Sequence, residues 1–402
     1  MKTHMIRVSQ LSTYVPRECG LATYAYDLCS SCNKSKIIEP IKIMAINDHE
    51  ATYDYPHEVK MQIDEKNFKA YMYAADIINE YSDLLHIQHE YGIFGGAGGG
   101  YLVSFLKKIH IPVVVTFHTM LSKPTKLLHK VTKQIAAHCE GIVVMSEYAK
   151  TILKKVYGIE KKKVHVIHHG VHDMEYKASN EVKDRLNLKN KIVLMTFGLI
   201  NQGKGIEYVI EALPRLVKEF PELIYLVIGE THPDVRIKEG EIYRHKLMKM
   251  VDSLGLVNHV KFQNRYLTLQ EVLTYLHVSD IYITPYIYSE QVCSGTLAYA
   301  IGSGKAIVST PYVYAQEMLK GGRGVFVKAK DVISIYKKIR LLIKNPQLRE
   351  EISWNAYQLG REMTWACVGK KHIELYLQLF QDHNSFLAKP QIRETISSTL
   401  SF

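Results

Sequence analysis

The sequence has no long apolar run. No segment approaches the roughly 20 residues needed to span a bilayer, and the N-terminal MKTHMIRVSQL is too short and too polar for a signal peptide. These absences predict a cytoplasmic protein. With 402 residues, of which 47% are hydrophobic and 23% charged, the chain is long enough for two domains with sizeable cores.

Motifs for metals and nucleic acids are also absent. The only close cysteine pair, Cys29 and Cys32, has no second pair to complete a zinc site. D-x-D and H-E-x-x-H do not occur, and the histidines of HHGVH (His168, His169, His172) form a poor chelate because neighbours in a strand face opposite ways. We therefore predict no metal centre and interpret HHGVH as a hinge. Since zinc-finger, RRM and KH signatures are missing, we expect no nucleic-acid partner.

Positive charge is in excess, with a formal net charge of +11. Four lysine groups lie in the N-terminal half: Lys107-Lys108, Lys126 to Lys133, Lys154-Lys155 and Lys161 to Lys163. A solvated lysine-rich surface explains them, and so does a basic face that makes peripheral contact with an anionic membrane or a phosphorylated substrate. The sequence leaves these alternatives open.

Apolar strand-like runs alternate with helical patterns along the whole chain, which predicts an α/β protein with largely parallel sheets. The runs are MIRVSQL, IKIMAI, LLHIQ, PVVVTF, GIVVMS and VHVI in the first half, and IVLMTFG, IYLVIG, HVKFQ, IYITPY, AIVST and GVFV in the second. Two doubly wound domains follow, with a seam near residue 172, where a polar stretch separates the two halves. Ligands are expected in a cleft between the domains, beyond the carboxyl ends of the strands.

The segment from Tyr282 to Pro311 carries the clearest functional signal. Ser294, Gly295 and Thr296 lie where a strand run gives way to a helical pattern, so their backbone N–H groups converge at a positive helix end. Lys204 precedes another predicted helix, where a cation opposes the helix dipole unless an anion relieves it. The two features predict a phosphate site, although an exposed turn lysine is the alternative for Lys204.

This segment resembles the donor-binding motif of glycosyltransferase family 4, whose members are retaining enzymes of the GT-B fold. When Gly304-Lys305 is registered on the family's Gly-Lys, Gln291 and Tyr299 stand where most members carry the glutamates of E-x7-E. The resemblance implies that Glu290 or Gln291 orients donor hydroxyls. Tyr299 stands at the position of the second glutamate, which in most members holds the nucleotide ribose.

The same resemblance implies roles for other residues that follow strands. Lys204 corresponds to the lysine that stabilises the leaving diphosphate, and His118, after VVVTF, corresponds to the catalytic histidine that contacts the transferred sugar. His89, Glu90 and the glycines that follow, including Gly95 and Gly96, resemble a substrate loop, with a flexible surface loop as the alternative.

Two further regions give less specific signals. Arg17, Glu18 and Gly20 in VPRECG resemble the first loop, which approaches the donor phosphate and the acceptor, although a simple strand-helix turn explains them nearly as well. Arg265 lies near the region where family members bind the base, and a surface arginine is an equal alternative.

The resemblance covers most of residues 5 to 380 and implies two Rossmann-like domains in the GT-B arrangement. We expect an acceptor-side domain at 1–172, a donor-side domain at 173–364, a returning helix at 365–382 and a tail at 383–402. Neither the oligomeric state nor the acceptor is predicted.

The implied function is hexosyl transfer, for example of mannose, from a nucleotide sugar to a hydroxyl of a glycan, lipid-linked or small-molecule acceptor. GDP-mannose and UDP- or ADP-hexoses are the candidate donors, and no cofactor is required. Because the E-x7-E glutamates are missing, and Leu199 stands where the family usually carries an arginine for the diphosphate, two alternatives stay open. They are a GT-B glycoside phosphorylase that uses phosphate or sugar 1-phosphate, and a non-catalytic sugar- or nucleotide-binding module.

Overall fold

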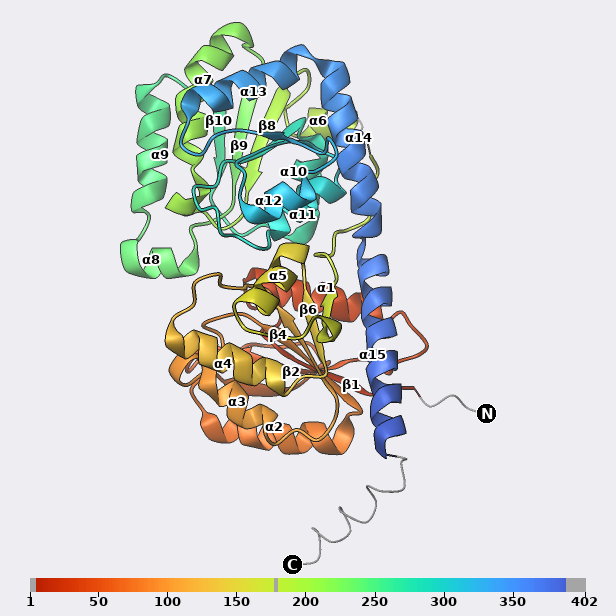
Figure 1. The fold of residues 1–402 in the computed structure, drawn as a ribbon. Coiled ribbons are helices and arrows are strands. Elements are labelled where there is room, and N and C mark those ends of the chain that lie inside the picture. The colour runs from red at the N-terminus through yellow and green to blue at the C-terminus, as the bar shows by residue number, and fades with distance from the viewer. Residues whose placement is uncertain (1–4, 177–179, 388–402) are drawn as a thin grey trace, which may run out of the picture. The chain divides into compact units, whose positions relative to one another are not determined.

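The computed structural model of the chain describes residues 5–176 and 180–387. It contains two compact units, Met1–Gly170 with Trp365–Phe402, and Val171–Thr364. We call them unit 1 and unit 2 and describe each by itself (Figure 1). The division falls close to the seam expected near residue 172.

Unit 1 is built around a seven-stranded parallel sheet of order β3-β2-β1-β4-β5-β6-β7. Its strands are β1 (Val8–Ser12), β2 (Lys42–Asn47), β3 (Val59–Asp64), β4 (Leu84–His89), β5 (Val113–Phe117), β6 (Gly141–Val144) and β7 (Val164–Val166). The central strands β1, β4 and β5 are buried along their whole length. Burial on both faces explains the nearly continuous apolar run of β5, whereas β1 and β4 also bury polar side chains. The strand β3 was not predicted, because VKMQID lies at the sheet edge, where its residues are half-buried or exposed except for the buried Ile63.

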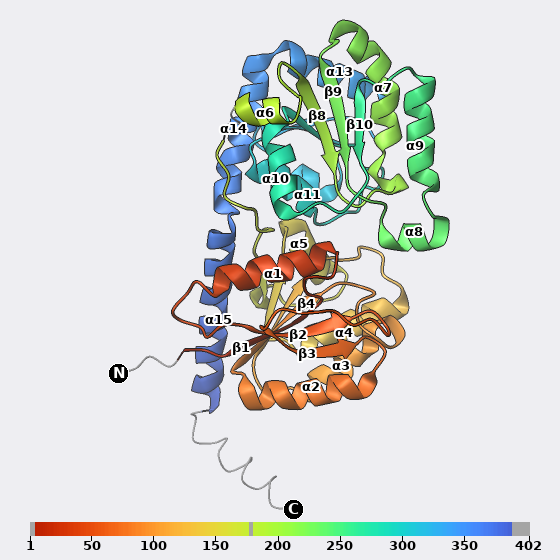
Figure 2. The same cartoon turned by 180° about the vertical axis from the view of Figure 1, so that it is seen from behind.

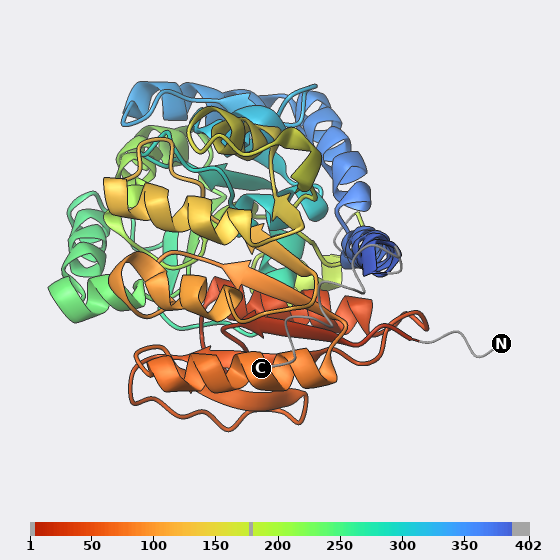
Figure 3. The ribbon, with the colours of Figure 1, turned by 60° about the horizontal axis from the view of Figure 1, so that its bottom comes forward.

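The helices of unit 1 connect successive strands, and one comes from the C-terminal end of the chain. They are α1 (Gly20–Cys32), α2 (Phe68–Tyr81), α3 (Gly100–Leu106), α4 (Lys126–Ala137), α5 (Glu147–Lys155) and α15 (Trp365–Leu387), with 3₁₀ turns η1 (Ala97–Gly99) and η2 (Lys161–Lys163). Helix α15 packs against α1 (Figure 2) and is seen end-on beside it in Figure 3. Ser31 Oγ donates to the Trp365 carbonyl at 2.6 Å, which ties the two helices together.

Helix α15 extends past its predicted end at Asp382. Its last turns are largely exposed, and the side chain of Phe386 is 57% exposed. A helix end that buries little shows no apolar periodicity, so the pattern ended before the helix did. The rest of the predicted tail, residues 388–402, lies outside the described residues.

Unit 2 contains a six-stranded parallel sheet of order β10-β9-β8-β11-β12-β13. Its strands are β8 (Ile192–Phe197), β9 (Leu223–Ile228), β10 (Val260–Gln263), β11 (Ile281–Thr284), β12 (Ala306–Ser309) and β13 (Val325–Phe326). Its helices are α6 (Asn180–Arg185), α7 (Ile206–Glu219), α8 (Pro233–Glu239), α9 (Ile242–Ser253), α10 (Leu269–Val278), α11 (Gly295–Gly302), α12 (Val313–Met318), α13 (Val332–Lys344) and α14 (Pro346–Glu362), with the 3₁₀ turn η3 (Gln202–Lys204).

Two hydrophobic cores lie on the two faces of this sheet, because successive strand residues point to opposite faces. On β8, Leu194 packs into the core shared with α7, α9 and α13, whereas Val193 and Met195 pack into the core shared with α10, α11 and α12. All described strands of both sheets pair in parallel, so the carboxyl ends of the strands in each unit lie at one edge of its sheet.

No helix in the described part of the chain is both long enough and apolar enough to cross a membrane.

Candidate functional site

Each sheet has one topological switch point. In unit 1 it lies between β1 and β4, because the chain runs outward to β2 and β3 on one side and to β5, β6 and β7 on the other. In unit 2 it lies between β8 and β11. Ligands of open parallel sheets bind beyond the carboxyl ends of the strands at such points.

The loops that follow β8 and β11 pack closely on each other. Ile287 N donates to the Gly203 carbonyl at 3.0 Å. Gly205 has φ +64°, and a Cβ there would lie 2.2 Å from the Pro285 carbonyl oxygen. The backbone can approach so closely only where a side chain is absent, so this glycine is required by the docking of the two loops.

Lys204 is anchored at this junction by a tyrosine. Its Nζ donates to Tyr286 Oη at 2.8 Å and lies 4.3 Å from the centroid of the same ring. The Tyr286 hydroxyl also bonds Thr296 Oγ1 at 2.8 Å. Lys204 and the first turn of α11, predicted from separate segments to bind phosphate, are thus joined through one phenol.

The first turn of α11 supplies backbone donors. Ser294 is the N-cap, and its Oγ accepts from Leu297 N at 3.3 Å. Its hydroxyl therefore caps the helix, while the first-turn amides of Gly295 and Thr296 lack intrahelical acceptors. An anion at this end gains both amide hydrogen bonds and the helix dipole.

Tyr286 is fully enclosed and electrostatically perturbed. Burial alone would raise its pKa, but the charge and hydrogen bond of Lys204, together with the bond to Thr296, lower the pKa below its ordinary value. Burial raises the pKa values of the neighbouring Tyr282 and Tyr312. The phenol beside Lys204 is therefore the first of the three to ionise.

The residues that replace the family's glutamates lie in different surroundings. Glu290 is exposed, and Gln291 Nε2 donates to the Cys293 carbonyl at 2.8 Å within its own loop. Tyr299, on α11, stacks its ring on Phe197 with 6.2 Å between centroids and 8° between planes. The loop amide of Gln291 is thus already bonded internally.

Arg265, predicted near the base, forms an exposed ion pair. Its guanidinium contacts both carboxylate oxygens of Glu271, through Nη1 at 3.0 Å and through Nη2. The same carboxylate completes the capping box of α10 with Thr268. These contacts hold Arg265 in a surface network at the start of α10.

In unit 1, the loop after β1 holds Arg17 beside an acidic partner. Arg17 Nη2 contacts Asp48 Oδ1 at 2.6 Å. Glu18 is exposed, and Gly20 is the first residue of α1, whose N-cap is Cys19. This loop follows β1 directly at the switch point.

On the other side of that point, His89 is the last residue of β4 and Glu90 follows it. His89 is buried and stacks on Phe94, and burial lowers its pKa to about 4. Glu90 accepts from Tyr91 N and from Thr119 Oγ1, both at 2.8 Å. Burial raises the pKa of Glu90.

The glycine loop after β4 is packed against its own unit. Gly95 N donates to Tyr71 Oη at 3.2 Å, and a Cβ at Gly95 would lie 1.8 Å from the Glu65 carbonyl oxygen. Gly96 has φ +78°, which favours glycine. Packing alone therefore accounts for both glycines.

His118 follows β5 and is partly exposed. Its Nε2 lies 2.9 Å from Gln88 Oε1, and its ring packs edge-to-face on Tyr24 at 4.6 Å between centroids. Burial, with smaller effects from the neighbouring histidines, lowers the pKa of His118 well below its ordinary value. The imidazole is therefore neutral near pH 7.

The histidines of HHGVH make local contacts. Nδ1 of His168 lies 3.0 Å from the Met145 carbonyl, and Nδ1 of His169 lies 2.7 Å from the Gly170 carbonyl. Within residues 5–176 and 180–387, no group of three His, Cys, Asp or Glu side chains is arranged to hold a metal ion.

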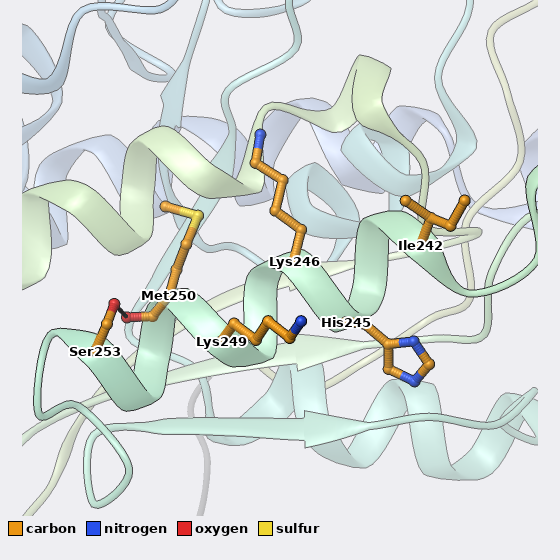
Figure 4. Close-up of a pocket in the computed structure, with 6 residues that line it drawn as sticks. All are labelled: Ile242, His245, Lys246, Lys249, Met250 and Ser253. Atoms are coloured by element: carbon orange, nitrogen blue, oxygen red, sulfur yellow. Dashed lines mark hydrogen bonds between the residues drawn. The ribbon is translucent and has the colours of Figure 1, made fainter.

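A surface hollow of about 660 Å³ lies on α9 (Figure 4). Its lining residues come from this one helix: Ile242, His245, Lys246, Lys249, Met250 and Ser253. None of the residues predicted from the sequence lines it.

Sequence reasoning missed the residues that hold Lys204 and His118. Tyr286 lies within the segment from Tyr282 to Pro311, but nothing in the sequence marks its hydroxyl as a partner of Lys204. Gln88 is a polar residue that ends the apolar run LLHIQ, which is the one signal in the sequence that sets it apart.

Comparison with known proteins defines the family. The family model "Glycosyltransferase Family 4" matches residues 53–174, and the model "Glycosyl transferases group 1" matches residues 178–359. The chain belongs to the family 4 glycosyltransferases and has the GT-B fold.

The sequence relatives are distant. An uncharacterized glycosyltransferase of Methanocaldococcus jannaschii is 27% identical over 252 residues, which span 62% of this chain and 60% of that protein. A phosphatidyl-myo-inositol mannosyltransferase of Mycobacterium tuberculosis is 22% identical over 274 residues, which span 66% of this chain and 67% of that protein. The match thus leaves about two fifths of the first relative uncovered.

Solved structures share the fold over nearly the whole chain. Anabaena Alr3699/HepE in complex with UDP and glucose superposes with a TM-score of 0.74 at 15% identity and covers 93% of this chain and 100% of that chain. Sucrose-phosphate synthase from Thermosynechococcus elongatus gives a TM-score of 0.75 at 14% identity, with 94% and 100% covered.

Proposed function

We propose that this protein is a retaining glycosyltransferase that moves a hexose, with mannose as a candidate, from a nucleotide sugar to an acceptor hydroxyl. The observation that carries the proposal is the junction of Lys204, Tyr286 and the first turn of α11 at the switch point of unit 2. The relatives support it, since one acts as a mannosyltransferase and a structural neighbour was solved with UDP and glucose.

In this proposal unit 2 binds the donor. The ammonium of Lys204 and the amides of Gly295 and Thr296 hold the diphosphate, and they stabilise the negative charge that grows on it when the bond to the sugar breaks. These donors are in place before the reaction, which lowers the cost of reorganising them. No metal is needed for this step.

Unit 1 contributes the acceptor side and His118. The acceptor oxygen bonds to the anomeric carbon on the face from which the diphosphate leaves, and the acceptor proton passes to the departing phosphate oxygen. The products are the glycosylated acceptor and a nucleoside diphosphate, so atoms and charge balance without a cofactor. Arg17 and Glu90 lie at the switch point of unit 1 and are the proposed contacts to these substrates, whereas the ring of His89 is buried beside Phe94.

The first test is thermal stabilisation by GDP, UDP, ADP, GDP-mannose, UDP-glucose, mannose 1-phosphate and inorganic phosphate. A ligand that binds only the folded state raises the melting temperature. We expect a shift with one nucleotide and its sugar, and loss of that shift in Lys204→Met. The exposed Lys218 of α7 gives the matched control, because Lys218→Met removes the same charge away from the junction.

The outcomes separate the alternatives. A response confined to phosphate and sugar phosphate would replace the transferase by a glycoside phosphorylase. Binding without turnover of any donor and acceptor pair would indicate a binding module. The absence of any shift would refute the proposal.

A further inference from the structure

The sheet of unit 1 contains two fully buried glutamines on neighbouring strands, Gln10 on β1 and Gln88 on β4. A buried amide is costly unless it is hydrogen-bonded. Gln10 Nε2 donates to the Ala25 carbonyl of α1 at 3.3 Å, and Gln88 Nε2 donates to Gln10 Oε1 at 3.3 Å. Gln88 Oε1 lies 2.9 Å from Nε2 of His118.

The direction of this chain of hydrogen bonds is set at its inner end. A backbone carbonyl only accepts, so the amide nitrogen of Gln10 must face Ala25, and its oxygen then faces Gln88. Gln88 consequently turns its nitrogen to Gln10 and its oxygen to His118. An amide oxygen also only accepts, so Nε2 of His118 must carry a proton.

The other groups around Gln88 agree with this orientation. His86 presents ring nitrogens 3.3 and 3.4 Å from Gln88 Nε2, on the nitrogen side of the amide. Both nitrogens of His86 have further partners, Thr116 Oγ1 at 2.8 Å and the Tyr376 hydroxyl of α15 at 2.7 Å. No group competes with His118 for the Gln88 oxygen among the described residues.

We propose that Gln10 and Gln88 are positioning residues that fix His118 in the Nε2–H tautomer, so that its Nδ1 accepts a hydrogen bond from a sugar hydroxyl. The ligand in this statement rests on the proposed function, whereas the tautomer does not. Nδ1 has no hydrogen-bond partner within the described part of the chain, and the side chain is partly exposed. The amide brings no negative charge to the ring, and burial lowers the pKa of His118 well below its ordinary value.

This role explains why polar side chains occupy the centre of the sheet. Two apolar residues of similar volume would fill the same space without any need for paired amides. The glutamines instead extend a rigid link from the backbone of α1 to the ring of His118. A ring held at one nitrogen presents the other in a fixed direction, which is the arrangement that positions a substrate group.

The direct test is nitrogen NMR of the full chain with ¹⁵N-labelled histidine, in the absence of ligand. His118→Gln serves only to assign the His118 signals by difference. We expect a neutral ring with the proton on Nε2 from pH 6 to pH 8. A proton on Nδ1, or a charged ring in this range, would refute the inference without reference to activity.

Variants of the two glutamines test whether the hydrogen bonds from Gln10 through Gln88 set the tautomer of His118. In Gln88→Leu, His118 should show a mixture of tautomers, and Gln10→Met should weaken the preference through the freed amide of Gln88. Gln88→Glu keeps an accepting oxygen and should keep the Nε2 proton, with the pKa of His118 raised by the carboxylate. The matched control is Ser9→Ala, which removes a buried hydroxyl bonded to Ser82 at 2.6 Å on the same strand as Gln10.

Turnover gives the second measurement. One lost neutral hydrogen bond corresponds to roughly two- to ten-fold, so Gln88→Leu should lower kcat/KM for the nucleotide sugar by about that factor, with partial rescue in Gln88→Glu. An unchanged tautomer in Gln88→Leu, with the protein folded, would refute the positioning role. If wild type binds no nucleotide sugar, the proposed function fails while the tautomer measurement stands.

Discussion

The hydroxyl of Tyr286 is the most informative single group to remove. Tyr286→Phe keeps the ring, which stacks on Tyr312 at 5.1 Å between centroids, and deletes the oxygen that joins Lys204 to Thr296. The contact between the ammonium and the ring face, at 4.3 Å, remains possible. At neutral pH we therefore expect affinity for the nucleoside diphosphate to change by no more than about ten-fold, the upper value of one net neutral hydrogen bond.

Tyr286→Phe should have a larger effect on how the affinity for the nucleoside diphosphate depends on pH. The pKa of Tyr286 is lowered in the free protein, and a bound diphosphate beside the phenol raises it again, because two negative charges repel. The complex then holds more protons than the free protein between the two pKa values. Binding takes up a proton in that window, so affinity falls as the pH rises through the free-state pKa, by up to about ten-fold per pH unit.

Calorimetric titration of the preferred nucleoside diphosphate from pH 7 to pH 10 measures this slope. Wild type should lose affinity with rising pH more steeply than Tyr286→Phe. The control is Tyr312→Phe, which removes the hydroxyl of the stacked neighbour and should keep the wild-type slope. Equal slopes in wild type and Tyr286→Phe would show that this phenol does not ionise near the anion, and the reasoning would be wrong.

Three other substitutions have defined outcomes. Lys204→Met should weaken binding of the nucleoside diphosphate roughly ten- to hundred-fold, since a charge-assisted hydrogen bond contributes about 1.5–3 kcal/mol. The urea midpoint of the variant should stay nearly unchanged. A small loss of affinity would contradict the role of Lys204 in diphosphate binding. Gly205→Ala should lower the free energy of unfolding by about 2–4 kcal/mol, because it combines a φ of +64° with a clash against Pro285. The control Gly255→Ala has a similar φ of +67° but open space around the added Cβ, so it should cost only about 1 kcal/mol. Burial lowers the pKa of Lys305 to about 8 in the folded protein, so between that pH and about 10.4 the unfolded chain binds more protons than the folded chain, and stability rises with pH. The urea midpoint of wild type should therefore rise across this range relative to that of Lys305→Met. Parallel curves of urea midpoint against pH would refute the assignment.

The order of the elements could be predicted from sequence because buried parallel strands leave continuous apolar runs. Val113–Phe117 and Leu223–Ile228 are buried throughout and were recognised directly. Strand Val59–Asp64 was missed since only one of its residues, Ile63, is fully buried. An edge strand is defined by its hydrogen bonds to a neighbour, and that pairing leaves little trace in local composition.

The site was only partly predictable for a related reason. Glycines at a strand end and small residues at a helix start mark a phosphate-binding turn by their own local geometry, so Lys204 and Thr296 could be proposed. The phenol that joins them lies in the loop before α11, far from Lys204 in sequence, and Gln10 and Gln88 are distant from His118 in sequence. Contacts between segments become visible only when the strands are placed side by side.

The two switch points share a chemical feature that bears on the reaction. Lys204 is held by a phenol and His118 by an amide, and neither has a carboxylate partner within the described residues. A carboxylate in either place would form an ion pair, which would neutralise the ammonium or raise the pKa of the imidazole. An anionic donor would then have to displace an existing partner before it gained any attraction. Because neither group is held by a carboxylate, no carboxylate competes with the diphosphate for the ammonium of Lys204, and Nδ1 of His118 stays available to accept from a hydroxyl.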